Sequence, residues 1–388
     1  MTIDLVPPRV RRGVPVPVLV LAATILPLLC ALIWRPSLMM SDLRVYYAAA
    51  RGLIDGQDIY TVHHQYPGMG LGFTYPPFAA IVLAPLAIGQ EFGRLLMTLL
   101  SGASLLVIGW TTAKALRWGR TAAVVIAFAA LAFEPVWSTF GLGQINLILL
   151  ALLMLDLLGH LPQRYRGILV GVATGIKLTP GIFIVFLLVT RRFREAAVAA
   201  GTTLATIVIG WLVMPGPATD FWSRYIFDPG RPGPAQYVGN QSVRGAIARL
   251  TQNSAVTTPL WLLAATVIGM AGLLLARRLY DRGSALEAIV VTAFTGLLVS
   301  PISWTNHWVW AVPAAAVLWA QRRTVVAAVW TAVFVVGLPW WMPFAGDREY
   351  DWTAIQSVAG DAYLLGGLLL LAVLNSEARM RYTWRLRS

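Results

Sequence analysis

The chain has 388 residues; 58% are hydrophobic and only 12% are charged, about half of the roughly 25% that is usual in soluble domains. A single water-soluble core cannot absorb this much apolar surface, so the composition excludes a soluble, disordered or collagen-like protein and favours a membrane protein with many spans. The net charge of +13 is scattered through short loops, so we expect no nucleic-acid partner. The single cysteine, Cys30, cannot form a disulfide framework.

Apolar runs along the chain predict ten membrane spans, although several are short for the ~20 residues that a span needs. The first run follows three arginines and resembles a signal peptide at that basic end. It is too long for one and lacks a small-residue cleavage site, so we expect a retained span. The expected spans are residues 14–34, 95–113, 121–137, 145–159, 197–215, 259–276, 286–303, 305–320, 324–341 and 358–375.

Two further apolar stretches are interrupted, and such segments at membrane depth face protein or a cavity. Pro85 interrupts residues 78–88, and a Lys-Leu-Thr-Pro-Gly sequence interrupts residues 168–190. Arginines flank 168–190 on both sides, which the positive-inside rule places in the cytoplasm. We therefore expect two short helices here, with the turn around Lys177 pointing outward.

The same rule assigns 20 of the 30 basic residues to cytoplasmic segments. The result is one integral membrane domain over residues 1–388 with about twelve crossings or re-entrant helices, both termini in the cytoplasm and a cytoplasmic tail at 376–388. The longest polar segments, 35–77 and 216–258, then lie outside the cytoplasm. Their many Tyr, Trp, Asp, Asn and Gln residues favour a site for a polar substrate.

Asp42 lies eight residues beyond the first expected span, at the boundary between water and lipid. A carboxylate there can reach both a lipid head group and an incoming hydroxyl, so Asp42 is a candidate general base. The alternative is a helix N-cap, because Ser41 and Asp42 precede an expected interfacial helix that ends near Gly56.

Lys177, one of only two lysines, lies inside the broken segment 168–190. An ionisable side chain at membrane depth is a functional candidate because a partner must offset its desolvation, and a lipid phosphate is a suitable partner. The alternatives are a lysine that extends to the interface or one that pairs with Glu134 or Asp156.

Other polar side chains cluster near the expected outer surface. His307 could bond a phosphate, a sugar hydroxyl or the catalytic carboxylate, or could be a satisfied interfacial residue. Gln144 and Asn146 suit sugar hydroxyls, although helix capping explains such residues equally well. Glu134 faces the same loop, and Arg244 could hold an anionic group or contact lipid phosphates.

Metal-binding signatures are missing from the sequence, which has no His-Glu-x-x-His, cysteine pair or Asp-x-Asp. We therefore expect neither a metal nor another cofactor. The cytoplasmic loops are also too short to house a domain that binds a nucleotide sugar.

Six ordered motifs carry a family resemblance. They are Asp-Leu-Arg-Val-Tyr at 42–46, Phe-Thr-Tyr-Pro-Pro-Phe at 73–78, Gly-Gln-Ile-Asn at 143–146, Gly-Ile-Lys-Leu-Thr-Pro at 175–180, Asn-Gln-Ser at 240–242 and Ser-Pro-Ile-Ser-Trp-Thr-Asn-His-Trp-Val-Trp at 300–310. Over residues 14–375 the chain thereby resembles actinobacterial polyprenol-phosphate-mannose-dependent alpha-1,2-mannosyltransferases of glycosyltransferase family 87.

The resemblance implies an all-α GT-C fold in the plasma membrane, a polyprenyl-phosphate-mannose donor used on the periplasmic side, and a mannosylated glycolipid acceptor such as a phosphatidylinositol mannoside or lipomannan. It implies Asp42 as the base and His307 as the motif histidine, and we expect Lys177, His307 and Arg244 to bind the donor phosphate. Arg44 and Asn306 stand where the family often has histidine. The residues expected to bind substrate are Arg44, Tyr47, Glu134, Gln144, Asn146, Asn240, Gln241 and Trp304.

Three alternatives stay open: an arabinofuranosyltransferase of the same family, a transporter or lipid flippase, and a scaffold subunit of an envelope complex. The chain shows no internal repeat, which weakens the inverted-repeat transporter alternative. A transporter predicts a cavity that opens alternately to both faces. A scaffold predicts that Asp42, Lys177 and His307 do not converge, whereas the enzyme predicts that they surround one outward-facing cavity.

Overall fold

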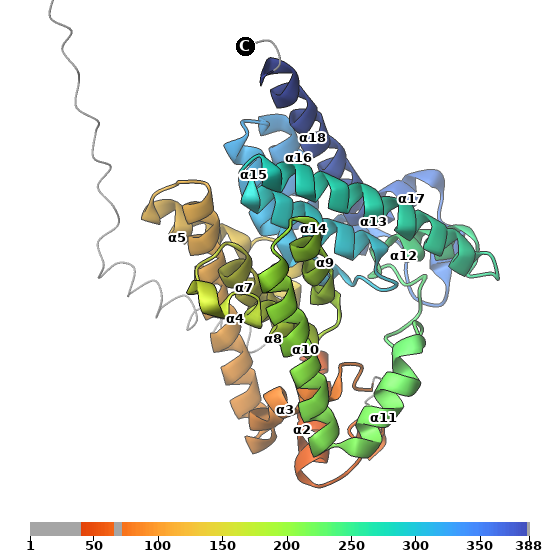
Figure 1. Cartoon of the computed structure of the whole chain (residues 1–388). Helices are drawn as coiled ribbons and strands as arrows, with labels where there is room; N and C mark the ends of the chain where they lie inside the picture. The colour runs from red at the N-terminus through yellow and green to blue at the C-terminus, as the bar shows by residue number, and fades with distance from the viewer. Residues whose placement is uncertain (1–39, 66–71, 386–388) are drawn as a thin grey trace, which may run out of the picture.

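The structure, a computed structural model, describes residues 40–65 and 72–385. In this part of the chain every regular element is a helix and no strand forms (Figure 1). The prediction of an all-α protein is thus confirmed for the described residues. The first expected span, residues 14–34, and Cys30 lie outside them.

The first half of the chain packs around α4 (Gln90–Ala115), which contacts α2, α5 and α7. Its length of 26 residues is about 39 Å at 1.5 Å per residue. The other elements are α2 (Ser41–Ile54), η2 (Val62–Gln65), α3 (Pro77–Leu83), η3 (Ala84–Ile88), α5 (Arg120–Ala130), α6 (Glu134–Leu142), α7 (Asn146–Leu157), η4 (Gln163–Tyr165), α8 (Ile168–Ile176), η5 (Thr179–Gly181) and α9 (Ile182–Val189).

The second half packs around α13 (Thr257–Asp281) and α14 (Ala285–Val299), which run against each other and against α18 (Ala362–Arg385). Earlier in the chain than α13, helix α11 extends to one side of α10 (Figure 1). The other elements are α10 (Phe193–Val213), α11 (Pro215–Ser223), η6 (Tyr225–Phe227), α12 (Val243–Leu250), η7 (Thr305–Trp310), α15 (Ala311–Ala320), α16 (Thr324–Val336), η8 (Leu338–Trp341), η9 (Arg348–Asp351) and α17 (Ala354–Gly360).

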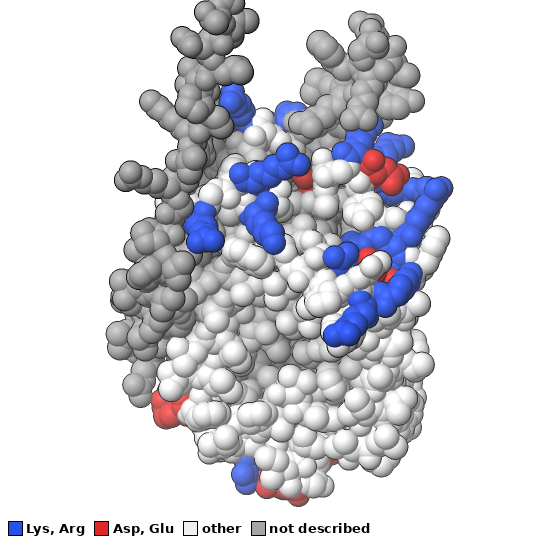
Figure 2. Space-filling view, turned by 60° about the vertical axis from the view of Figure 1, so that its left-hand side comes forward, with Lys and Arg blue, Asp and Glu red and all other residues white. Residues whose placement is uncertain are grey.

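The described helices have the apolar surfaces of a membrane protein. On α13, Leu262, Leu263 and Leu274 are between 53% and 65% exposed, which suits contact with lipid. Figure 2 shows Lys and Arg gathered at one end of the visible face, above a broad band almost free of charge. By length and composition, three described helices can cross a membrane, or up to five if each of two bent pairs counts as one span. The predicted number of about twelve crossings or re-entrant helices is therefore not confirmed.

The expected span 121–137 is two helices in the structure, since α5 ends at Ala130 and α6 begins at Glu134 with a bend of 65°. Pro135 fits the break, because it lies in the first turn of α6, where its missing backbone N–H is tolerated, and its ring would clash with the carbonyl four residues earlier if α5 continued through it. The expected span 358–375 also falls on a bent pair, α17 and α18, at 70°. The first bend buries Glu134 inside the protein.

Two short helices, α8 and α9, form in segment 168–190 as predicted, and the chain between them is non-helical at Lys177. Small residues fix this arrangement. A Cβ on Gly175 would lie 2.2 Å from Thr206 Oγ1, and one on Gly171 would lie 2.6 Å from the Ala199 carbonyl oxygen. Only glycine therefore allows α8 to approach α10 closely, and this packing fixes the position of the break.

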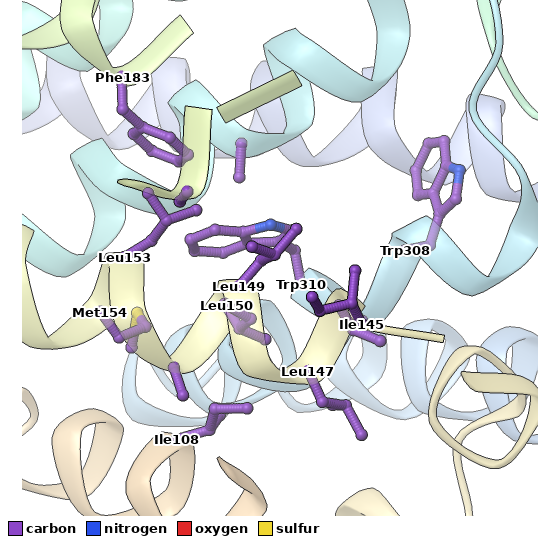
Figure 3. Packing of buried hydrophobic residues seen from close by; sticks show 14 of the residues in the cluster. Ile108, Ile145, Leu147, Leu149, Leu150, Leu153, Met154, Phe183, Trp308 and Trp310 are labelled. Atoms are coloured by element: carbon purple, nitrogen blue, oxygen red, sulfur yellow. The ribbon is translucent and has the colours of Figure 1, made fainter. Parts of the chain in front are cut away.

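A hydrophobic core lies directly behind the break. Leu149 and Leu153 on α7 pack with Phe183 on α9 and Trp310 at the end of η7 (Figure 3). The rings of Phe183 and Trp310 are 5.5 Å apart between centroids. This core holds together α7, which begins at Asn146, η7, which carries His307, and α9, which follows the break at Lys177.

Candidate active site

A cavity of about 520 Å³ lies where the start of α2, the turn before α7, the break after α8 and the chain before η7 meet. The three side chains that were expected to converge do line this one cavity. A scaffold subunit does not require such convergence. Five of the expected site residues line it: Asp42, Gln144, Lys177, Trp304 and His307.

Asp42 lies in the first turn of α2, whose N-cap is Met40 with no side-chain capping bond. Asp42 is therefore not the N-cap of α2, and that alternative is wrong. Ser41 Oγ donates to Asp42 Oδ1 at 3.1 Å, and Gln144 Nε2 donates to Oδ2. Burial raises the pKa of Asp42 above its ordinary value, while these two hydrogen bonds and the charge of Lys177 lower it in part.

Two buried tyrosines fix the amide of Gln144. Tyr46 Oη donates to Gln144 Oε1 at 2.8 Å, and Tyr75 Oη donates to the same oxygen at 3.1 Å. With its oxygen occupied in this way, the amide presents its nitrogen to Asp42. Both tyrosines lie inside the family motifs at 42–46 and 73–78, and Tyr46 follows Asp42 by four residues and so shares its helix face.

Lys177 reaches from the break into the cavity. Its Nζ donates to Asn146 Oδ1 at 3.0 Å and lies 3.0 Å from His307 Nε2. The ammonium also lies 5.3 Å from the centroid of the Tyr75 ring. Charge interaction joins it to Asp42, so the acid, the lysine and the histidine form one electrostatic unit.

The alternative pairing of Lys177 with Glu134 or Asp156 is not found, because both carboxylates have other partners. Glu134 accepts hydrogen bonds from Thr305, Trp340 and Tyr363 at 2.9–3.2 Å. Asp156 accepts the backbone N–H groups of residues 167 and 170, at the start of α8. Glu134 is fully inside the protein and does not line the cavity.

Asn240 and Gln241 are also buried away from the cavity. Asn240 Oδ1 accepts the backbone N–H of Ser303 at 3.0 Å, and Gln241 Nε2 donates to the Gly360 carbonyl at 2.6 Å. An isolated bridge pairs Asn240 with Trp304, which does line the cavity. These two residues therefore position a wall of the cavity rather than form it.

The remaining expected residues lie beside the cavity or further away. Asn146 does not line the cavity; its Oδ1 accepts a hydrogen bond from Lys177 Nζ, and its Nδ2 donates to the Asn306 carbonyl at 3.0 Å. Arg244 donates to the Pro229 carbonyl at 3.1 Å and does not line the cavity. Arg44 and Tyr47 do not line it either.

Arg231, which the sequence analysis did not single out, lines the cavity as well. It lies in an Asp-Pro-Gly-Arg-Pro-Gly segment, a composition that predicts a loop and gives no indication of which way the arginine points. Within the described residues, no group of three or more His, Cys, Asp or Glu side chains is placed to hold a metal ion.

Comparisons with known proteins give one answer. The model of glycosyltransferase family 87 matches residues 73–301. A polyprenol-phosphate-mannose-dependent alpha-(1-2)-phosphatidylinositol pentamannoside mannosyltransferase of Mycobacterium tuberculosis is 37% identical over 325 residues, covering 78% of this chain and 73% of that protein. A polyprenol-phosphate-mannose-dependent alpha-(1-2)-phosphatidylinositol mannoside mannosyltransferase of Mycolicibacterium smegmatis is 31% identical, covering 88% and 84%.

Among solved structures, the crystal structure of ArnT from Cupriavidus metallidurans bound to undecaprenyl phosphate is similar. The similarity covers 95% of this chain and 79% of that chain, with 19% identity and a TM-score of 0.46.

Proposed function

The chain belongs to glycosyltransferase family 87, and from this premise we propose that it is a GT-C enzyme that transfers mannose from polyprenyl-phosphate-mannose to a mannosylated lipid, forming an alpha-1,2 linkage. The observation that carries the proposal is the cavity in which Asp42, Lys177 and His307 meet. A base beside two nitrogen groups that can receive a phosphate is what this transfer needs.

The reaction is an inverting displacement at the anomeric carbon of a beta-linked donor. An acceptor hydroxyl oxygen forms the new bond to that carbon while the bond from the carbon to the phosphate oxygen breaks, and the polyprenyl phosphate leaves with the electron pair. Asp42 takes the hydroxyl proton. Lys177 and His307 stabilise the negative charge that develops on the departing phosphate.

Gln144 has a supporting role in this scheme, because its amide holds one oxygen of Asp42. The other oxygen has only Ser41 as a side-chain partner, which leaves it the better acceptor for the substrate proton. Tyr46 and Tyr75 keep the Gln144 amide in the required orientation. Trp304 lines the cavity and offers an aromatic face to a sugar ring, whereas Arg44 and Tyr47 do not line it and have no role in this scheme.

We place the cavity at the periplasmic side of the plasma membrane, with both termini in the cytoplasm. α4 runs from η3, which packs against α2, to the start of α5. Asp42 lies on α2, near the N-terminal end of α4, because α2 packs against η3. Arg117 and Arg120 follow the C-terminal end of α4, about 39 Å from its start. This separation supports the positive-inside assignment, as does the gathering of basic residues at one end (Figure 2).

The test is mannose transfer by the purified protein in lipid nanodiscs. Polyprenyl-phosphate-[14C]mannose is supplied with a phosphatidylinositol mannoside, and the lipid product is digested with an alpha-1,2-mannosidase. Labelled product that the mannosidase releases supports the proposal. Arabinose transfer without mannose transfer would favour the arabinofuranosyltransferase alternative. Movement of label across a liposome bilayer without a new glycosidic bond would favour the flippase.

A further inference from the structure

Arg231 stands apart from the groups used in the proposed mechanism. Its guanidinium carbon lies 4.0 Å from the ring centroid of Tyr225 and 4.7 Å from that of Tyr60. The two rings come from the two long polar segments, 216–258 and 35–77. Arg231 is half-buried and faces the cavity that holds Asp42. Its position is thus set by aromatic contacts on a wall of the cavity.

No carboxylate forms an ion pair with Arg231 among the described residues, although the charges of Asp58 and Asp228 act on it from farther away. The two nearby acids are engaged locally. Asp228 Oδ1 accepts the Gly230 N–H at 3.0 Å, and Asp58 Oδ1 accepts the Tyr60 N–H at 2.9 Å. Arg231 therefore keeps N–H donors for a ligand in the cavity.

A phosphodiester is the ligand that best fits this arrangement. The planar guanidinium matches two phosphate oxygens at once, which an ammonium cannot do. Two tyrosine rings already hold it, so little conformational entropy is lost when an anion binds. In the proposed function, both lipid substrates carry a phosphodiester, and one cavity must accommodate both.

The cavity offers two separate cationic positions, Lys177 and Arg231, for these two phosphates. The donor phosphate adjoins the anomeric carbon and must lie near Asp42, whose charge interacts with Lys177. Arg231 instead lies on another wall of the cavity, against Tyr60 and Tyr225, and forms no hydrogen bond with Lys177, Asn146 or His307. Resting on the proposed function, we infer that Arg231 binds the phosphodiester of the acceptor lipid and selects acceptors that carry one.

The test compares two acceptors with the same terminal mannose: a phosphatidylinositol mannoside and a neutral alkyl mannoside. The wild type is expected to show a higher kcat/KM for the phosphodiester acceptor. In Arg231→Gln this preference is expected to fall at least about tenfold, and Arg231→Lys is expected to retain part of it. The matched control is Arg224→Gln, which removes an exposed arginine that also contacts Tyr225 but does not line the cavity; it is expected to keep the wild-type preference.

A preference in Arg231→Gln within about twofold of the wild type overturns the inference. An equal rise in donor KM with both acceptors also overturns it, because the phosphate bound would then be that of the donor. A second measurement needs no variant. Glycerophosphoinositol is expected to inhibit the wild type in competition with the acceptor, and competition with the donor contradicts the assignment. Failure of the wild type to transfer mannose to either acceptor refutes the proposed function itself.

Discussion

Two buried polar networks lie close together in this protein and differ in one respect. The cavity network comprises Asp42, Gln144, Lys177 and His307. The interior network comprises Glu134, Gln241, Arg249 and Asp361. Both join segments distant in sequence and both bury carboxylates.

In the interior network the carboxylates are enclosed by protein donors. Glu134 accepts hydrogen bonds from Thr305, Trp340 and Tyr363. Asp361 pairs with Arg249, whose guanidinium also donates to three backbone carbonyls. Asp42 has only Ser41 and Gln144 as side-chain donors and lines a cavity. Burial of a carboxylate thus does not by itself indicate catalysis. Asp42 differs from Glu134 and Asp361 because it lines a cavity that Lys177 and His307 also line.

The largest expected effect is that of Asp42→Asn, which keeps the shape of the side chain and removes its basicity. The transfer rate is expected to fall by about 10²–10⁴-fold if general base catalysis is the only role. Asp55→Asn, at the exposed end of the same helix, is the matched control and is expected to keep the wild-type rate. Undiminished transfer by Asp42→Asn at normal expression would remove Asp42 from the mechanism.

Arg249→Met tests the interior network through stability. It leaves the Asp361 carboxylate buried without its partner, which is expected to cost about 3–5 kcal/mol. The double variant Arg249→Met, Asp361→Leu is expected to recover much of the loss, because no buried charge remains. Thermal unfolding in detergent measures both. Unchanged unfolding of the single variant would show that the pair contributes little.

Lys177→Met should weaken donor binding by about 10- to 100-fold, since it removes a charge-assisted contact to the leaving phosphate. The only other lysine, Lys114, provides the control. It contacts His160 and Trp110 far from the cavity, so Lys114→Met is expected to leave the donor KM unchanged. If Lys177→Met leaves the donor KM as unchanged as Lys114→Met does, Lys177 has a structural role.

Tyr75→Phe is expected to have the smallest effect, a loss of about fivefold in kcat/KM for one hydrogen bond to Gln144.

The same variant is expected to shift the pH profile. Asp42 must be deprotonated to act, so activity falls as pH drops through its pKa, which burial raises above that of an ordinary aspartate. In Tyr75→Phe the Gln144 amide loses one of its partners and donates less well to Asp42, which raises the pKa of Asp42 further. The acid limb of the pH profile should move to higher pH in Tyr75→Phe and stay in place in Tyr165→Phe, which alters an exposed tyrosine outside the cavity.

The sequence predicted the parts of the site that local physics determines. Lys177 is identifiable because a lone lysine in a broken apolar segment needs a partner, and the break appears where expected. Asp42 is identifiable from its distance to the first expected span. The all-helical membrane architecture follows from composition, and Pro135 marks the bend before α6 inside the expected single span 121–137.

What the sequence could not supply is the direction in which a polar side chain points. Glu134, Asn240 and Gln241 were expected at the substrate because they neighbour polar loops, yet their partners lie inside the protein. Arg231 and Tyr75 were missed for the converse reason. Nothing in a Gly- and Pro-rich loop or an aromatic motif shows that its side chain will meet one from a segment far away in sequence.

The most direct test of the central claim is a structure of Asp42→Asn in nanodiscs with polyprenyl-phosphate-mannose bound. We expect donor phosphate oxygens within hydrogen-bond distance of Lys177 Nζ and a His307 ring nitrogen, with the anomeric carbon facing the residue 42 side chain. A phosphate bound elsewhere, with Lys177 and His307 still paired only to each other and to Asn146, would contradict it.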